Sequence, residues 1–223
     1  MIKFNYAREP VFIVCGRTRL AGMLELPPSP HGMVILNRDE DSRRLAPCGN
    51  YLADELRRTG LALLLLDLFG PEEASGDQQR LDIARLDTRL AAAADWLTAE
   101  PETRKLALGL FGTGCGAAAA VRLAASRPDQ IAALVSCGGR PDLAGAEALA
   151  RVRAPTLLIV GEEDHAISQL NREALNHLGG EKDLALIRGA THPGTQPHTL
   201  QEAARLAARW FNGYLGGGAP PVP

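Results

Sequence analysis

The stretch Leu110-Phe111-Gly112-Thr113-Gly114-Cys115-Gly116-Ala117 decides the fold, because it joins an apolar strand to a helix through three glycines. Glycines at such a turn permit a tight backbone and the close approach of a ligand. The run Leu106–Phe111 predicts a buried strand, and Gly116–Ser126 predicts an Ala-rich helix. The turn between them is therefore the first place to look for chemistry.

Two motifs compete at this turn. One is the nucleophile elbow, in which a reactive side chain sits on the turn and the next N–H helps to bind an oxyanion. The other is the dinucleotide fingerprint G-x-G-x-x-G/A, which Gly112, Gly114 and Ala117 formally satisfy. The fingerprint needs an acidic residue about 20 positions later. The next predicted strand ends in Leu134-Val135-Ser136-Cys137 and offers no acid, so the elbow is the favoured interpretation.

Strands and helices alternate on both sides of the turn. Short apolar runs separated by helical patterns indicate a parallel sheet covered on both faces. We predict one α/β domain over residues 1–214, with a doubly wound, mostly parallel sheet of about eight strands, and a flexible tail over 215–223. No insertion between Val135 and Thr156 is long enough for a cap domain. The predicted strands are Val11–Cys15, Leu20–Leu26, Met33–Leu36, Leu61–Leu66, Leu106–Phe111, Ile131–Val135, Thr156–Val160 and Leu184–Ile187.

Composition excludes several classes of protein. In the 223 residues, 24 Lys and Arg oppose 26 Asp and Glu, so the formal net charge of −2 provides no basic stripe for nucleic acid. The longest apolar run, Leu61–Leu66, is far shorter than the roughly 20 residues that span a bilayer. The four cysteines form no CxxC pair, which is typical of reduced thiols. We expect a cytoplasmic protein that binds a small molecule, with no nucleic-acid or membrane partner, and the sequence leaves a homodimer open.

An acid and a histidine follow the last two predicted strands. Asp164 comes after Thr156–Val160, and His192 comes after Leu184–Ile187. In a parallel sheet both loops lie at the carboxyl edge, where ligands bind. We predict that Asp164 holds the Nδ1–H of His192 and leaves Nε2 as a general base. The other histidines lack such a context and are interpreted as surface residues.

Two further strand ends supply candidate pocket residues. Asn37 and Arg38 open a charged loop that either contributes an oxyanion N–H or caps the following helix. Cys137 and Arg140 lie after the strand Ile131–Val135. There Cys137 is either near the pocket or a small buried thiol, which is the commoner case.

At these residues the chain resembles the dienelactone hydrolase-like branch of the α/β-hydrolase superfamily, in particular small hydrolases fused to or near phosphoribosyltransferases. The resemblance implies attack on esters, lactones or thioesters by a Ser or Cys nucleophile, without a cofactor. It is carried by Leu66-Asp67-Leu68 with Pro71-Glu72-Glu73, Gly109-Leu110-Phe111-Gly112 with Gly116-Ala117-Ala118-Ala119-Ala120, Gly138-Gly139-Arg140-Pro141-Asp142-Leu143-Ala144, Ala154-Pro155-Thr156-Leu157-Leu158-Ile159-Val160-Gly161, and Gly189-Ala190-Thr191-His192.

Three departures fall around the expected pocket. Gly114 occupies the slot of the family's nucleophile and has no reactive side chain. The family's His-Gly-rich oxyanion loop is replaced by Asn37-Arg38-Asp39-Glu40, and Cys137 stands where the family has Arg. Losing the nucleophile abolishes most covalent catalysis, on the order of 10⁶-fold in a triad enzyme. The sequence therefore indicates a site that was remodelled or retired.

Three functional hypotheses follow. The first is acid–base chemistry by His192 and Asp164 without an acyl-enzyme. The second is a noncatalytic binding or regulatory protein. The third is a cysteine-type hydrolase, in which a one-residue shift makes Cys115 the nucleophile; without that shift, Cys115 faces back into the fold and its N–H is the oxyanion donor. A metal site is not expected, because Cys115, Cys137, Asp164 and His192 lack ligand-type spacing.

Overall fold

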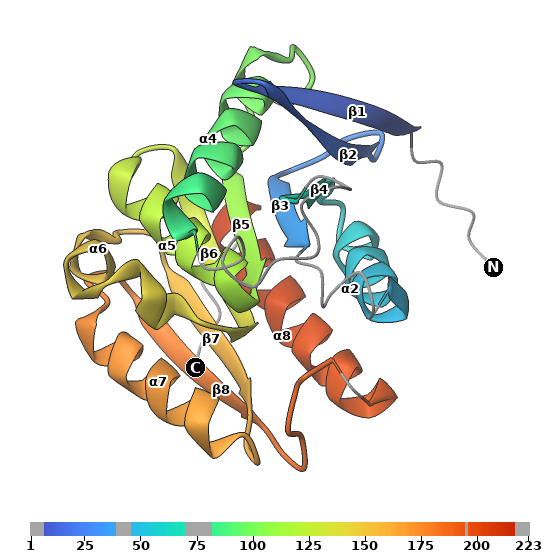
Figure 1. Cartoon of the computed structure of the whole chain (residues 1–223). Helices are drawn as coiled ribbons and strands as arrows, with labels where there is room; N and C mark the ends of the chain where they lie inside the picture. Colours follow the sequence, from blue (N-terminus) through green and yellow to red (C-terminus); the bar gives the residue numbers. More distant parts are fainter. Residues whose placement is uncertain (1–6, 39–45, 70–81, 195, 217–223) are drawn as a thin grey trace.

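A computed structural model describes residues 7–38, 46–69, 82–194 and 196–216. Its centre is a sheet of eight strands in the order β1-β2-β4-β3-β5-β6-β7-β8 (Figure 1). The strands are β1 (Ala7–Cys15), β2 (Thr18–Leu26), β3 (Met33–Arg38), β4 (Ala62–Asp67), β5 (Leu108–Thr113), β6 (Ile131–Gly139), β7 (Thr156–Gly161) and β8 (Lys182–Ile187).

The sheet is parallel from β4 to β8, and β2 is the strand that runs against the others. β1 pairs antiparallel with β2, and β2 pairs antiparallel with β4. The remaining neighbours, β3 with β4 and β5, and then β6, β7 and β8 in turn, are all parallel. The predicted doubly wound, mostly parallel sheet of eight strands is thus confirmed. After β4 the chain crosses β3 to form β5 on its other side, and the elbow lies at the carboxyl end of β5.

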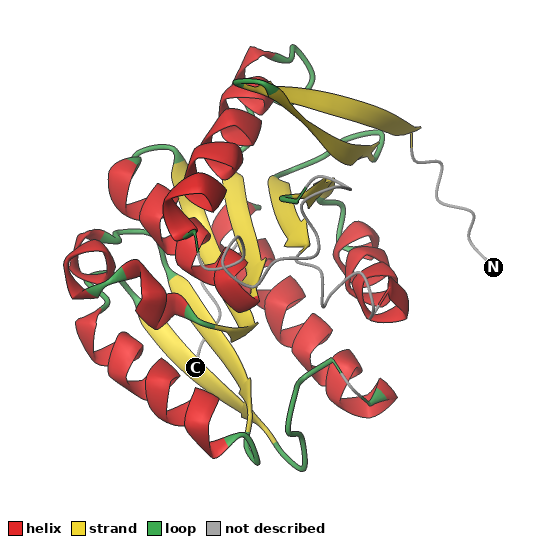
Figure 2. Cartoon of the chain, viewed as in Figure 1, coloured by secondary structure: helices red, strands yellow, loops and turns green. Residues whose placement is uncertain are grey.

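Helices cover both faces of the sheet (Figure 2). One buried cluster unites the sheet with α4, α5, α6 and α7, and the other unites it with α2 and α8. The helices are α2 (Ala46–Arg58), α4 (Ile83–Ala99), α5 (Gly114–Ser126), α6 (Ala146–Arg151), α7 (His165–His177) and α8 (Pro197–Leu215), with a 3₁₀ turn, η1, at Pro141–Ala144. None of these helices is long and apolar enough to cross a membrane.

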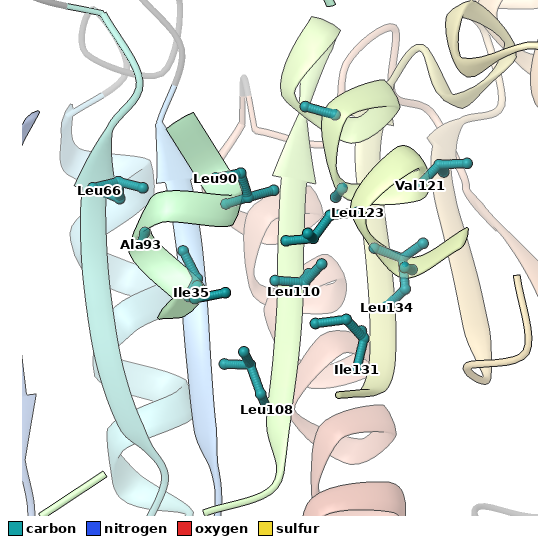
Figure 3. Close-up of a cluster of buried hydrophobic side chains, with 14 of the residues drawn as sticks. Ile35, Leu66, Leu90, Ala93, Leu108, Leu110, Val121, Leu123, Ile131 and Leu134 are labelled. Atoms are coloured by element: carbon teal, nitrogen blue, oxygen red, sulfur yellow. The ribbon is translucent and has the colours of Figure 1, made fainter. Parts of the chain in front are cut away.

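Packing explains why the strands read as unbroken apolar runs. Both faces of β4 and β7 are covered, so almost every side chain in these strands is buried. Helix α5 is almost all alanine on its buried side, which lets it approach β5 and β6 closely. The first cluster includes Ile35, Leu66, Leu90, Ala93, Leu108, Leu110, Val121, Leu123, Ile131 and Leu134 (Figure 3).

Two element boundaries differ from the sequence prediction in ways that matter for the site. Helix α5 begins at Gly114 rather than Gly116, so the strand passes into the helix without a loop. Strand β6 continues to Gly139 rather than ending at Val135, which places Cys137 inside the sheet. The segment between β6 and β7 holds only η1 and α6, so no cap domain is inserted there.

Candidate functional site

The elbow at the end of β5 is built around bare backbone. Gly114 has φ +47°, the left-handed region that favours glycine, while Thr113 before it is extended. The special backbone position of the turn is thus residue 114 and not Cys115. Gly112 lets the helix close on the strand, because an added Cβ there would lie 2.7 Å from the Cα of Ala117.

Asn37 ties the end of β3 to this elbow. Its side chain is buried, and its Nδ2 donates a hydrogen bond to the carbonyl oxygen of Gly116 at 3.0 Å. Gly116 has no room for a side chain, because a Cβ would lie 2.4 Å from Asn37 Oδ1. Asn37 therefore clamps the first turn of α5 from inside. The backbone of Arg38 pairs with Asp67, whereas the side chain of Arg38 and the charged loop at 39–45 lie outside the described residues.

The cysteines beside the elbow are packed as small apolar side chains. Cys137 belongs to the core cluster on the α2 and α8 face, and burial raises the pKa of its thiol to about 12. That thiol stays protonated at neutral pH. This agrees with the interpretation of Cys137 as a small buried thiol. Cys115 is half-buried on the first turn of α5 and packs against the core on the α4 face.

The end of β6 forms a second glycine turn, Gly138–Arg140, that touches the elbow. A bridge pairs Gly139 with Gly114, and the N–H of Arg140 donates to the carbonyl oxygen of Gly114 at 2.9 Å. Asn171 links α7 to this turn, since its Nδ2 donates a hydrogen bond to the carbonyl oxygen of Gly139 at 3.0 Å.

The guanidinium of Arg140 is held by its own turn. It forms a two-pronged pair with Asp142, at 2.8 Å from Nε and 2.7 Å from Nη2. These hydrogen bonds raise the pKa of Arg140 above its usual value. Its charge is thus already balanced by a neighbouring carboxylate.

The imidazole of His192 lies against the same glycine turn. Gly138 has φ +56°, and a Cβ on it would lie 2.7 Å from His192 Nε2. The other ring nitrogen, Nδ1, accepts a hydrogen bond from the N–H of Gly194 at 3.1 Å. A nitrogen that accepts from an N–H carries no proton, so this hydrogen bond favours the tautomer with its proton on Nε2.

The carboxylate of Asp164 forms a different hydrogen bond from the one predicted. It is the N-cap of α7, and its Oδ1 accepts a hydrogen bond from the N–H of Ile167 at 3.1 Å. Its loop does lie beside the histidine loop, because the N–H of Glu163 donates to the carbonyl oxygen of Ala190 at 2.9 Å. Within the described part of the chain, however, no hydrogen bond or ion pair joins Asp164 to His192.

The predicted hydrogen bond from His192 Nδ1–H to Asp164 is therefore not formed in this structure. The physical reason is that Nδ1 accepts from the N–H of Gly194 and so has no proton to donate, while Oδ1 of Asp164 accepts from the N–H of Ile167. One signal was available in the sequence, since Asp is a favoured N-cap and Asp164 directly precedes the residues that form α7. Asn171 and Gly138 carried no such signal. Among the described residues, no three His, Cys, Asp or Glu side chains form a group that could hold a metal.

Comparisons with known proteins agree with this architecture. A dienelactone hydrolase from Anabaena variabilis has a crystal structure that is 41% identical, with a TM-score of 0.87, over 94% of this chain and 99% of that one. An esterase domain from a Rhodothermus marinus protein shares the fold at 18% identity, with a TM-score of 0.77, over 94% of this chain and 100% of that one.

Two Mycobacterium tuberculosis proteins named as phosphoribosyl transferases are 41% identical over 95% of this chain. The chain spans about half the length of these curated relatives, covering 48% of each. The model of the dienelactone hydrolase family matches residues 72–209, a region that contains the elbow, the glycine turn Gly138–Arg140, Asp164 and His192. The chain therefore belongs to the dienelactone hydrolase family.

Proposed function

We propose that this protein binds a small molecule carrying a carbonyl or carboxylate oxygen and forms no acyl-enzyme with it. The observation that carries the proposal is Gly114 at φ +47°, which puts bare backbone at the position of the family's nucleophile. Without a side chain there, no bond to an acyl group can form at that position.

His192 supports binding better than base catalysis. A general base needs an unprotonated Nε2, and moving the proton to Nδ1 would set it against the N–H of Gly194. The ring is therefore suited to donate a hydrogen bond from Nε2 to an acceptor oxygen. A neutral histidine used in this way polarises or holds a carbonyl group rather than removing a proton.

The cysteine alternative finds less support in the geometry. Reactive thiols need an exposed, electropositive setting that stabilises the thiolate. Burial raises the pKa of Cys137 to about 12, and Cys115 packs against the core rather than occupying the strained position of the turn.

Stopped-flow kinetics with p-nitrophenyl acetate test the proposal. We expect no burst of p-nitrophenol and a steady rate that is the same in the wild type, His192→Gln and the matched control His198→Gln. A burst that disappears in Cys115→Ser would establish the cysteine alternative. Turnover lost in His192→Gln alone would establish acid–base catalysis.

Binding itself is tested with butyrate and γ-butyrolactone as probes. Long-range ¹H–¹⁵N NMR reports both ring nitrogens of His192, and we expect the Nε2–H tautomer in the free protein. Either probe should shift the Nε2 resonance in a saturable way, and His192→Gln should weaken that probe at least tenfold. A free protein with the proton on Nδ1 would overturn the proposed role of this residue.

A further inference from the structure

The two edges of the sheet are unequally protected. β8 begins with the exposed charged residues Lys182 and Asp183, a common way to discourage pairing with another strand. The opposite edge, β1, carries Phe12 and Val14, which are 58% and 68% exposed. These are the exposed large hydrophobic side chains of the described chain, and they stand two residues apart on the outermost strand (Figure 1).

The backbone of the same two residues also faces outward. A two-residue turn closes on a hydrogen-bonded pair, which here is Cys15 with Thr18. Hydrogen-bonded and non-bonded positions alternate along an antiparallel pair. Phe12 and Val14 therefore direct their N–H and C=O groups away from β2. Pro10 occupies the next such position and has no N–H to offer, so it limits the available segment.

We propose that β1 pairs antiparallel with β1 of a second copy of this chain, joining two sheets across a twofold axis at Ile13. In this register Phe12 lies opposite the partner subunit's Val14, and Val14 lies opposite the partner subunit's Phe12. The interface thereby contains two pairs of an aromatic with a β-branched side chain, which is a stabilising cross-strand combination. This inference does not rest on the proposed function.

Charges at the ends of the segment complement each other in the same register. Glu9 of one copy reaches the hairpin turn of the other copy, which carries the partner subunit's Arg17, and the symmetry repeats this approach at the other end. Both residues are exposed, and neither has an ion pair within the described part of the chain. Arg19 also lies over the ring of Phe12, with its guanidinium carbon 4.8 Å from the centroid, so it holds the ring in place. A strand that matches itself in apolar side chains, hydrogen-bonding groups and charge favours a second copy over an unrelated partner.

Sedimentation equilibrium between 5 and 200 µM tests the assembly. We expect a mass that rises with concentration toward twice the 23.7 kDa of one chain. Val14→Lys, at an exposed site, should weaken association at least tenfold without changing the thermal midpoint of unfolding. Gln201→Lys, an equally exposed substitution on α8, should leave association unchanged. A monomer at 200 µM, or equal association in both variants, would refute the proposed dimer.

Disulfide trapping tests the register. In a Cys15→Ser background, a mixture of Phe12→Cys and Val14→Cys chains should form the mixed disulfide, since paired residues lie about 5.5 Å apart between Cα atoms. Each variant alone should cross-link at least fivefold less. Equal cross-linking of either variant with itself would overturn the assignment of Ile13 to the axis.

Discussion

The two halves of the candidate site differ: one has a tightly specified backbone, and the other has polar side chains. The elbow at β5 and α5 keeps a tightly specified backbone, with positive φ at Gly114 and no space for a Cβ at Gly112 or Gly116, but it presents no reactive side chain. The loops after β7 and β8 keep an acid and a histidine, Asp164 and His192, but no hydrogen bond joins them.

This contrast teaches that backbone geometry and side-chain chemistry are under separate physical constraints. Gly112 and Gly116 are required by the close packing around the first turn of α5, and Gly114 by its positive φ, so these glycines serve stability whether or not the site reacts. A carboxylate and an imidazole have no such packing role, and each can satisfy its hydrogen bonds with nearby backbone groups. Substitutions in the two halves should therefore differ in kind.

The largest effect is expected at Gly112. Gly112→Ala places a methyl group 2.7 Å from the Cα of Ala117, where only backbone could move aside. We expect a loss of about 3 kcal/mol in the free energy of unfolding, measured with urea. The control in the other half is Gly189→Ala, which has φ +66° and no neighbour within 4 Å, and should cost only about 1 kcal/mol of backbone strain. Equal losses at both positions would remove the proposed asymmetry.

The next effect concerns Asn37. Asn37→Ala removes the buried hydrogen bond to the carbonyl of Gly116 and the side-chain packing around it, so we expect a loss of about 2 kcal/mol in unfolding free energy. Gly116→Ala should also destabilise, but at least about 1 kcal/mol less when Asn37 is already alanine, because its clash partner is then gone. Additive losses in this double-mutant cycle would contradict the clamp.

A smaller effect is expected at Asp164. Asp164→Ala removes the N-cap of α7 and should lower the unfolding free energy by about 1 kcal/mol. Asp164→Asn should restore most of it, because asparagine caps helices equally well. Neither variant should move the ¹⁵N resonances of His192. A shifted histidine tautomer in Asp164→Asn would instead show that the carboxylate acts on the ring.

The smallest effect is expected on activity at Gly114. Gly114→Ser restores a hydroxyl at the elbow, yet we expect no hydrolysis of p-nitrophenyl acetate above the wild type. The hydrogen bond from the N–H of Gly194 to His192 Nδ1 favours a proton on Nε2, the nitrogen that would have to accept the hydroxyl proton. The serine should cost about 1 kcal/mol of unfolding free energy, because φ +47° is unfavourable for it. A burst in this variant would mean that only the nucleophile separates the site from an active hydrolase.

Much of the fold could be predicted because it rests on local patterns. A short apolar run such as Leu61–Leu66, preceded by Gly60 and followed by an acid, indicates a buried strand, and the glycine spacing around Gly114 after such a strand indicates a tight strand-to-helix turn. The absence of a nucleophilic side chain at residue 114 also follows from the sequence alone, since glycine has no side chain in any conformation.

Tertiary structure alone decided which groups meet. Chain order placed Asp164 and His192 on neighbouring loops, but a hydrogen bond depends on distances and angles that chain order does not fix. In the structure His192 Nδ1 accepts from the N–H of Gly194, and Asp164 Oδ1 accepts from the N–H of Ile167. Tertiary structure also decided the role of Asn37. Its polar side chain predicts a loop residue, whereas in the structure it is buried and hydrogen-bonded to α5. Sequence patterns record burial and backbone freedom, whereas the pairing of polar groups is settled only when separate elements are brought into contact.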